Sequence, residues 1–448
     1  MANDRIGNPD NPRAIKRHDM LRRKHLVRNY ILHVLEGGLY MGGTKFRAAD
    51  SVLPVMVASL GGPAWLIGLT PVVGVIAWTT PALLVAHRIE RLPRHLPLVL
   101  TAGVFQRLPF LLAALALILL GKDYPTVALT ALVACPILSG ITGGFGLTAW
   151  QEIIANTVPP NRRSSLWAVR ALLTASIGLF AGGIVLKVVE AYGEGNPVGY
   201  GMLHLITFAF MVASYIAFAF VKETPYPRRP SRHSASLAGN LRQMPAMIRR
   251  DKRLGLFLVH RLLICGYWIA LPFLAIHALD VLGKGEQFVG TLLAAQMAGV
   301  VCGNAVAGLL GDRFGGKLAA MVGLTPVLGA CIWLLSASAA WQFWTCYFLL
   351  GAGWSMYEVG RFVLGVEICP VQRRASYLAL IGAMLIPGMI AASQISARLW
   401  EATSRNFTVI AAVAAAAMGL AIVFLIPIKE PRTHPAADVP SPSRAVPR

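Results

Sequence analysis

Apolar segments of about 20 residues or more recur along this chain, and each is long enough to cross a bilayer of roughly 30 Å as a helix. Hydrophobic residues make up 56% of the 448 residues and charged residues only 14%, against about a quarter in a soluble chain. We therefore predict an all-α polytopic membrane protein with about twelve transmembrane helices. The expected spans are 29–59, 63–86, 97–120, 124–155, 164–189, 200–221, 254–281, 288–310, 317–337, 341–366, 374–399 and 405–428.

Positive charge is distributed unevenly between the segments that join these spans. Thirty of the 41 Lys and Arg fall in alternate segments, beginning with the N-terminal one, and only five fall on the other side. Because Lys and Arg are retained on the cytoplasmic side, both termini are predicted to be cytoplasmic. The net charge of +21 then reflects the orientation of the chain in the membrane and does not indicate a nucleic-acid partner. We expect a multi-pass protein of a bacterial cytoplasmic membrane, in contact with lipid.

The longest polar interruption divides the spans into two groups of six. It contains several prolines and serines and is typical of a linker between domains. The predicted organisation is a basic cytoplasmic segment at 1–28, a six-helix bundle at 29–221, a cytoplasmic linker at 222–253, a second six-helix bundle at 254–428 and a disordered cytoplasmic tail at 429–448.

The two halves are related in sequence. A shift of 211 positions aligns Pro159 with Pro370 and Ser165 with Ser376, and the ungapped register continues to Glu190 and Glu401. A register shared over more than 30 residues indicates two pseudo-symmetric bundles. Because each half has an even number of spans, the repeat is parallel, and transporters built this way bind substrate between their halves near the midplane.

The loop after the eighth span carries a motif with a glycine, three further residues, Asp-Arg, one residue and another glycine. Its main residues are Gly308, Asp312, Arg313, Gly315 and Lys317. The motif resembles the signature loop of the major facilitator superfamily, which usually has a basic residue where Gly316 stands. The corresponding loop of the first half, His87 to Arg91, is degenerate. The resemblance implies an alternating-access transporter of two six-helix bundles.

A gating contact follows from the motif. An aspartate near a helix N-terminus meets unpaired N–H groups and the positive end of the helix dipole. By the repeat symmetry, Asp312 should face the start of the fifth span, where Ser164 or Ser165 is a natural N-cap. The predicted gating partners are Arg162, Arg163, Ser164 and Ser165. The alternative is an ordinary solvated turn.

A second element on the fifth span concerns the direction of transport. Gly178-Leu-Phe-Ala-Gly182-Gly183 resembles the Gly-Pro-x-x-Gly-Gly element of proton-coupled drug antiporters, with leucine in place of proline. Close packing of helices through small residues explains the same pattern. The resemblance slightly favours export.

Ionisable residues at membrane depth are candidates for the substrate or proton site, because charges there are costly and usually functional. On a straight first helix, Glu36, Tyr40, Arg47 and Asp50 share one stripe. Arg47 and Asp50 approach the outer rim, whereas Glu36 lies deeper and is the better proton-binding candidate. A buried carboxylate with only a gating role is the alternative.

Charged residues also occur on the third and tenth spans. Arg107 lies near the midplane and is predicted either to bind a substrate group or to pair with Glu36 or Glu358. Glu358 and Arg361 are one helical turn apart and are suited to pair with each other. The hypothesis is a central site of Glu36, Arg107 and Glu358, in which Glu36 or Glu358 takes up a coupling proton.

These features favour a secondary transporter rather than an enzyme, and we expect it to move a small-molecule substrate as a monomer, with protons as the coupling ion. The sequence has no P-loop and no HExxH or G-x-S-x-G motif, and it indicates neither a metal nor a cofactor. A non-transporting sensor of the same fold and a membrane-embedded enzyme are the alternatives. Six intramembrane basic residues against five acids favour no substrate charge.

Overall fold

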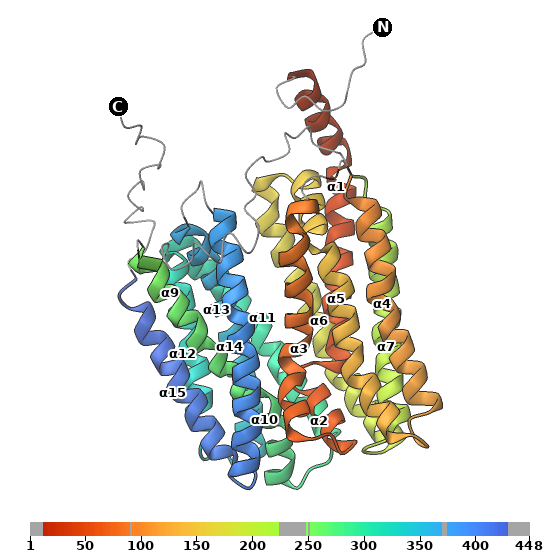
Figure 1. Ribbon diagram of the computed structural model, residues 1–448, viewed down its shortest axis with the longest axis vertical. Coiled ribbons are helices and arrows are strands. Elements are labelled where there is room, and N and C mark those ends of the chain that lie inside the picture. The colour runs from red at the N-terminus through yellow and green to blue at the C-terminus, as the bar shows by residue number, and fades with distance from the viewer. Residues whose placement is uncertain are drawn as a thin grey trace, which may run out of the picture.

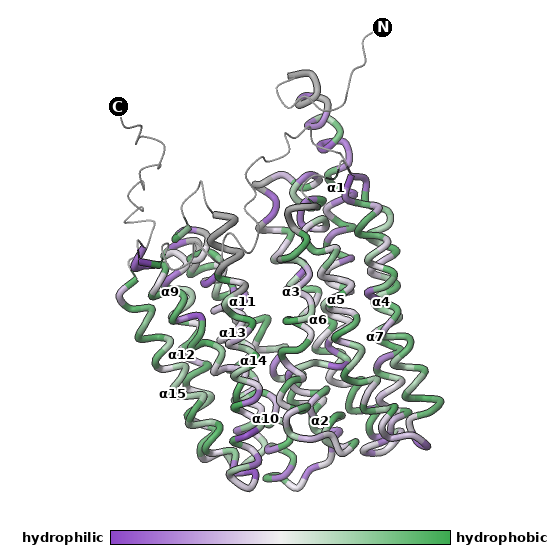
Figure 2. The backbone as a smooth tube through the Cα atoms, viewed as in Figure 1, coloured by the Kyte–Doolittle hydropathy of each residue, from purple (hydrophilic) through white to green (hydrophobic). Residues whose placement is uncertain are grey.

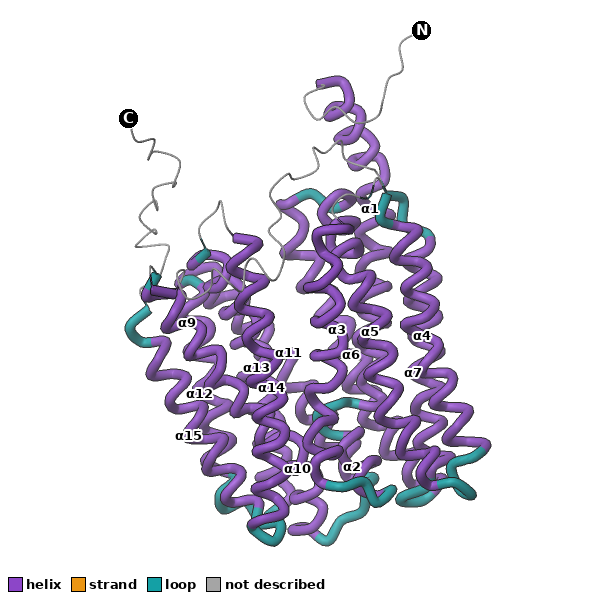
Figure 3. Tube along the Cα trace, in the orientation of Figure 1, coloured by secondary structure: helices purple, strands orange, loops and turns teal. Residues whose placement is uncertain are grey.

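The computed structural model describes residues 12–89, 92, 94–223, 248–249, 251–369 and 374–428. In this part of the chain all regular structure is helical (Figure 3). The helices form twelve rods of membrane length, two of which are interrupted. Nine of the described helices pass as membrane spans by length and composition. The predicted fold class, two helical bundles of a polytopic membrane protein, is confirmed. Most residues of the predicted linker 222–253 lie outside the described residues.

The first half of the chain contributes six rods and the second half six more (Figure 1). In the first half the helices are α1 (Pro12–Gly43), followed by η1 (Thr44–Arg47) and α2 (Val52–Ser59), then α3 (Ala64–Ile89), α4 (Leu96–Leu119), α5 (Pro125–Thr157), α6 (Pro160–Tyr192) and α7 (Pro197–Ala219). In the second half they are α9 (Lys252–Leu263), η2 (Ile264–Gly266) and α10 (Tyr267–Leu282), then α11 (Phe288–Phe314), α12 (Gly316–Trp333), α13 (Ala340–Ile368), α14 (Arg374–Ala402) and α15 (Phe407–Leu425).

Both interrupted rods are the first rods of their halves. The first expected span, 29–59, is not one helix: α1 ends at Gly43, and a 3₁₀ turn and a short loop precede α2. Gly43 itself keeps helical backbone angles, and the chain leaves helical geometry at Ala48, where ψ is 122°. The expected stripe that placed Arg47 and Asp50 on the same straight helix as Glu36 is therefore wrong, because the helical periodicity stops before both residues.

The start of α1 and the end of α15 lie at the same end of the molecule (Figure 1), which we call the termini face. The other end is called the opposite face. Apolar residues dominate the middle of the rods, and hydrophilic residues gather toward the ends (Figure 2). This distribution is what a lipid environment requires, because hydrocarbon offers no hydrogen bonds to polar groups.

Small residues bring α1 close to α6. A Cβ atom at Gly38 would lie 2.3 Å from the side chain of Leu173, and one at Gly42 would lie 2.7 Å from Ile177. Both distances are shorter than a van der Waals contact, so only glycine fits. Such close approach between helices is the usual packing device inside a membrane.

The repeat appears in the helix boundaries as well. α5 ends at Thr157 and α13 ends at Ile368, and these ends are separated by the same 211 positions as the sequence register. The positions on α13 that correspond to Leu147 and Trp150 of α5 are Glu358 and Arg361.

Contacts between the two halves lie toward the opposite face. Gln296 donates a hydrogen bond to Asp50 over 2.9 Å, and the backbone N–H of Gly195 donates one to Glu286 over 3.0 Å. A Cβ at Gly182 on α6 would lie 2.5 Å from the carbonyl oxygen of Gly290 on α11. Toward the termini face the ribbons of the two halves diverge (Figure 1).

Candidate functional site

A cavity of about 300 Å³ lies within the first half and is lined by α1, α3, α4, α5, α6 and α7. Its charged and amide side chains are Glu36, Gln106, Arg107, Gln151 and Arg170. Its aromatic side chains are Tyr40, Trp78, Trp150, Trp167, Tyr215 and Phe218. The volume is at the lower end of the range for ligand pockets, about 300–1,000 Å³. This combination of aromatic walls with a few ionisable groups makes the cavity the candidate site.

Glu36 of α1 forms an ion pair with Arg170 of α6 inside this cavity. The distance from the Glu36 carboxylate to Nη1 of Arg170 is 3.2 Å, and both residues are 7% exposed. The indole N–H of Trp150 also donates to the carboxylate, over 3.4 Å. A buried charge needs such partners, because the hydration that it loses is worth several kcal/mol.

The guanidinium of Arg170 is held by two aromatic rings and by a gap in α1. Its Cζ lies 4.9 Å from the ring centre of Trp150 and 4.8 Å from that of Trp167. A Cβ at Gly37 would lie 1.9 Å from the same Cζ atom. Gly37 therefore provides the space that allows the guanidinium to reach Glu36.

Arg107 of α4 is held mainly by backbone and aromatic groups. Its Nε donates to the carbonyl of Met211 over 2.7 Å, and its Nη1 donates to the carbonyl of Gly103 over 2.9 Å. The rings of Tyr40 and Tyr215 lie 5.7 and 5.1 Å from its Cζ. No described carboxylate lies within 4.0 Å of Arg107.

Tyr40 and Gln106 complete the polar wall beside Arg107. The amide of Gln106 donates to the hydroxyl of Tyr40 over 2.6 Å. Ser214 of α7 links the two charged parts of the site, because its hydroxyl donates to the Glu36 carbonyl over 2.9 Å and accepts from Arg107 over 3.3 Å. The site thus holds one carboxylate and two guanidinium groups.

Glu358 and Arg361 lie on α13 in the second half and do not line this cavity. They form a bidentate ion pair with each other, as their spacing of one helical turn allows. Nearby, Tyr357 accepts a hydrogen bond from Arg261 over 2.7 Å, and its ring packs against that of Trp354. The structure brings together Glu36 and Arg107 of the hypothesised trio, while Glu358 has a separate environment.

The expected outer-rim candidates, Arg47 and Asp50, lie at the boundary between elements. Arg47 is buried in η1, and its Cζ stands 4.9 Å from the ring centre of Phe110. Asp50 bonds to Gln296 of the other half. Neither residue lines the cavity that contains Glu36.

The motif residues lie where α11 ends and α12 begins. Gly308 and Arg313 are exposed on α11, and the Arg313 guanidinium lies 5.3 Å from the Phe314 ring. Gly315 has a φ of +93°, a conformation that favours glycine, and precedes α12. Lys317 donates to the carbonyl of Ile426 over 2.8 Å. The backbone of Asp312 is helical, but its side chain lies outside the described atoms.

The expected gating partners lie in the first turns of α6. The residue before this helix is Pro159, so the expectation that Ser164 or Ser165 is the N-cap is wrong. Ser165 instead accepts a hydrogen bond from Tyr30 over 3.1 Å, and Arg163 donates to the carbonyl of Ala155 over 2.7 Å. Arg162 is exposed, and the Ser164 side chain lies outside the described atoms.

The sequence did not identify Arg170 as the partner of Glu36. The two residues are 134 positions apart, and helical periodicity does not relate different helices. The available signal was Gly37-Gly38 beside Glu36, because paired glycines mark a helix face that another element approaches closely.

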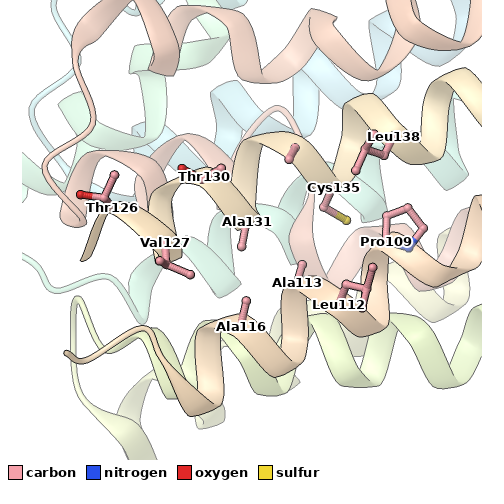
Figure 4. Close-up of a pocket in the computed structure, with 11 residues that line it drawn as sticks. Pro109, Leu112, Ala113, Ala116, Thr126, Val127, Thr130, Ala131, Cys135 and Leu138 are labelled. Carbon is pink, nitrogen blue, oxygen red and sulfur yellow. The ribbon is translucent and has the colours of Figure 1, made fainter. Parts of the chain in front are cut away.

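A second hollow, of about 340 Å³, lies between α4 and α5 (Figure 4). Its walls are almost entirely apolar and include Ala113, Ala116 and Leu138. It offers no charged side chain for orienting a polar solute. Within the described residues, no group of three or more His, Cys, Asp or Glu side chains is placed to hold a metal ion.

Comparison with known proteins finds sequence similarity to one family over part of the chain. The sequence model of the Major Facilitator Superfamily matches residues 256–447. The multidrug resistance protein MdtH of Yersinia enterocolitica is 24% identical over 139 residues, which are 30% of this chain and 35% of that protein. The match thus spans about a third of the length of this curated relative.

Solved transporter structures share the fold over nearly the whole chain. A D-xylose–proton symporter has a TM-score of 0.68 and 14% identity, over 91% of this chain and 98% of the other. A bacterial homologue of ferroportin in an inward-facing state has a TM-score of 0.62 and 15% identity, over 90% and 98% of the two chains. The chain is thus similar in sequence to the major facilitator superfamily over residues 256–447, and it shares the fold of these solved transporters over both halves.

Proposed function

We propose that this protein is a secondary transporter that moves a small organic solute across the membrane by alternating access between its two bundles. The observation that carries the proposal is the buried ion pair of Glu36 and Arg170 inside an aromatic cavity. Charges at membrane depth are costly and are retained mainly where they serve a solute or ion pathway. The match of the Major Facilitator Superfamily model to residues 256–447 supports the same function.

The arrangement of the two halves supports alternating access. The contacts of Asp50 with Gln296 and of Glu286 with Gly195 lie toward the opposite face. If the termini face is cytoplasmic, as the Lys and Arg distribution predicts, this arrangement is an inward-facing one. The inward-facing ferroportin homologue is a solved structure of similar fold. Transport then requires these contacts to break and others to form near the termini face.

Proton coupling is assigned to Glu36. A carboxylate that exchanges a proton must alternate between partners, and Arg170 is the cation that stabilises its ionised form. Movement of α6 relative to α1 during the cycle would separate the pair and favour protonation. Export is the direction proposed, on the resemblance of Gly178–Gly183 to the element of drug antiporters.

The test is transport by the purified chain in proteoliposomes, with a panel of organic solutes and with or without an imposed pH gradient. We expect accumulation of at least one solute that depends on the gradient and is lost on its collapse. Solute exchange should persist without a gradient in Glu36→Gln, because exchange needs no net proton movement. Specific solute binding with no flux in either direction would favour the non-transporting sensor instead.

Orientation is tested separately by labelling engineered cysteines at positions 225–250 in intact cells. A membrane-impermeant maleimide should react only after the cells are opened, because the linker is expected to be cytoplasmic. Labelling from outside would reverse the assignment of the termini face.

A further inference from the structure

We propose that the cavity around Arg107 selects planar aromatic monoanions, such as aromatic carboxylates. This inference rests on the proposed function, since it names the substrate class of the same site. The sequence alone favoured no substrate charge, because the comparison of basic with acidic residues included every ionisable residue at membrane depth. The cavity contains only a few of those residues, and their charges do not balance.

The charges of the side chains that line the cavity do not balance. Glu36 is paired with Arg170, whereas the described residues place no carboxylate within 4.0 Å of Arg107. The carbonyls of Met211 and Gly103 hold Arg107 through their dipoles, but they cannot neutralise it. The cavity therefore carries one net positive charge. A monoanion offsets it, whereas a cation adds repulsion in a medium of low dielectric constant.

Aromatic side chains form much of the wall of the cavity. Tyr40, Trp78 and Tyr215 line it together with Arg107, and the rings of both tyrosines lie within 6 Å of the guanidinium. Aromatic faces stack on planar ligands and leave the edge of the ligand free for hydrogen bonds. A ligand ring among these side chains would direct its carboxylate to Arg107.

The cavity also contains N–H donors that have no acceptor among the described residues. A guanidinium has five N–H donors, and Arg170 uses one nitrogen on Glu36. The indole N–H of Trp78 is buried and has no acceptor among the described residues. A ligand oxygen that reaches this nitrogen would supply that acceptor. These nitrogens are available to donate to the oxygens of an anion.

The probe is benzoate, the smallest planar aromatic carboxylate, in equilibrium binding of the radiolabelled compound to the purified full chain in detergent. Three competitors separate the features: benzamide removes the charge, benzylammonium reverses it, and cyclohexanecarboxylate removes the aromatic plane. We expect benzoate to compete best and cyclohexanecarboxylate more weakly, with benzamide and benzylammonium weaker by about 10- to 100-fold, the range of a charge-assisted hydrogen bond. Tighter binding of benzylammonium than of benzoate would overturn the proposal.

Two matched variants on α4 locate the site. Ala102 lines the cavity, and Ala116 lines the apolar hollow of Figure 4. Ala102→Phe fills the cavity without changing any charge and should abolish benzoate binding, whereas Ala116→Phe should leave it unchanged. Arg107→Gln should weaken binding, with Arg107→Lys retaining part of the affinity. Undiminished binding in both Ala102→Phe and Arg107→Gln would place benzoate elsewhere and refute the assignment.

The benzoate-binding assay and the transport assay test the two proposals separately. If benzoate binds as expected but no solute of any class crosses the membrane, the substrate class is supported as a ligand class and the transport proposal fails. If a cationic solute accumulates in proteoliposomes while benzoate does not bind, the transporter assignment stands and the present inference is wrong.

Discussion

The carboxylate of Glu36 on α1 lies 3.2 Å from the guanidinium of Arg170 on α6, and each group is the ionic partner of the other at membrane depth. The pair joins two helices that are far apart in sequence but adjacent in space. Because the pair is buried, the loss of one member leaves an uncompensated charge. Removing both members leaves no uncompensated charge, so a double-mutant cycle can measure the interaction between them.

We expect Glu36→Gln and Arg170→Gln each to destabilise the protein by about 3–5 kcal/mol, the usual cost of breaking a buried pair from one side. The double variant should be less destabilised than the sum of the two, with a coupling of about 0.5–3 kcal/mol. Denaturant unfolding in micelles measures both quantities. Strictly additive effects would mean that the two side chains do not interact in solution.

A steric variant tests the same pair without altering a charge. A Cβ at Gly37 would overlap the Arg170 guanidinium, whereas a Cβ at Gly329 meets nothing within 4 Å. Gly37→Ala should therefore displace Arg170 from Glu36 and reduce gradient-driven accumulation, and Gly329→Ala is the control. Equal transport by the two variants would show that the pair is not needed in this geometry.

Glu286 links the two halves at the opposite face by accepting hydrogen bonds from the Gly195 backbone and the Tyr200 hydroxyl. Glu286→Ala removes both bonds, so the ratio of opposite-face-open to closed states should rise by about tenfold or more. Spin labels at Glu190 and Arg405, in a background with the exposed Cys302 replaced, report the separation of the halves. Glu286→Gln, which retains one acceptor oxygen, should give an intermediate distribution. An unchanged distribution in Glu286→Ala would exclude this role.

The end of α7 is linked to α4 by Glu223, outside the membrane-spanning segments. Burial opposes ionisation of this carboxylate, but hydrogen bonds from the His95 side chain and from the backbone N–H groups of His95 and Leu96 hold its pKa below the ordinary value of 4.5. A lowered pKa in the folded state contributes stability above the ordinary value, and this contribution is lost as the pH falls through the folded-state pKa.

The expected pH profile follows from that sign. The thermal unfolding midpoint of the native chain should exceed that of Glu223→Gln at neutral pH. The difference should shrink as the pH falls below about 4.5 and should vanish below the folded-state pKa. A difference that stays constant down to the lowest pH would assign the effect to packing rather than to the charge.

The sequence predicted the helical class, the division into two related halves and the presence of Glu36 and Arg107 in a polar site. Composition and periodicity carry this information, because lipid imposes the same length and polarity on every span. The break after Gly43 and the pairing of Glu36 with Arg170 were not predictable in this way. The first depends on local backbone geometry, and the second depends on which helices pack together. Periodicity along one helix determines neither.

The motif at Gly308–Lys317 is predicted to contact the start of α6 when the termini face closes. Asp312→Asn should keep the fold while shifting the protein toward the arrangement described here, in which the halves meet at the opposite face. Cross-links between cysteines in 311–317 and 162–166 should form readily in the native chain under transport conditions and weaken in Asp312→Asn, because the amide cannot provide the negative charge that favours a helix N-terminus. Arg313→Gln is a useful comparison, since that guanidinium is exposed and lies against Phe314. An unchanged cross-linking pattern together with full transport would leave Asp312 as an ordinary residue of a solvated turn.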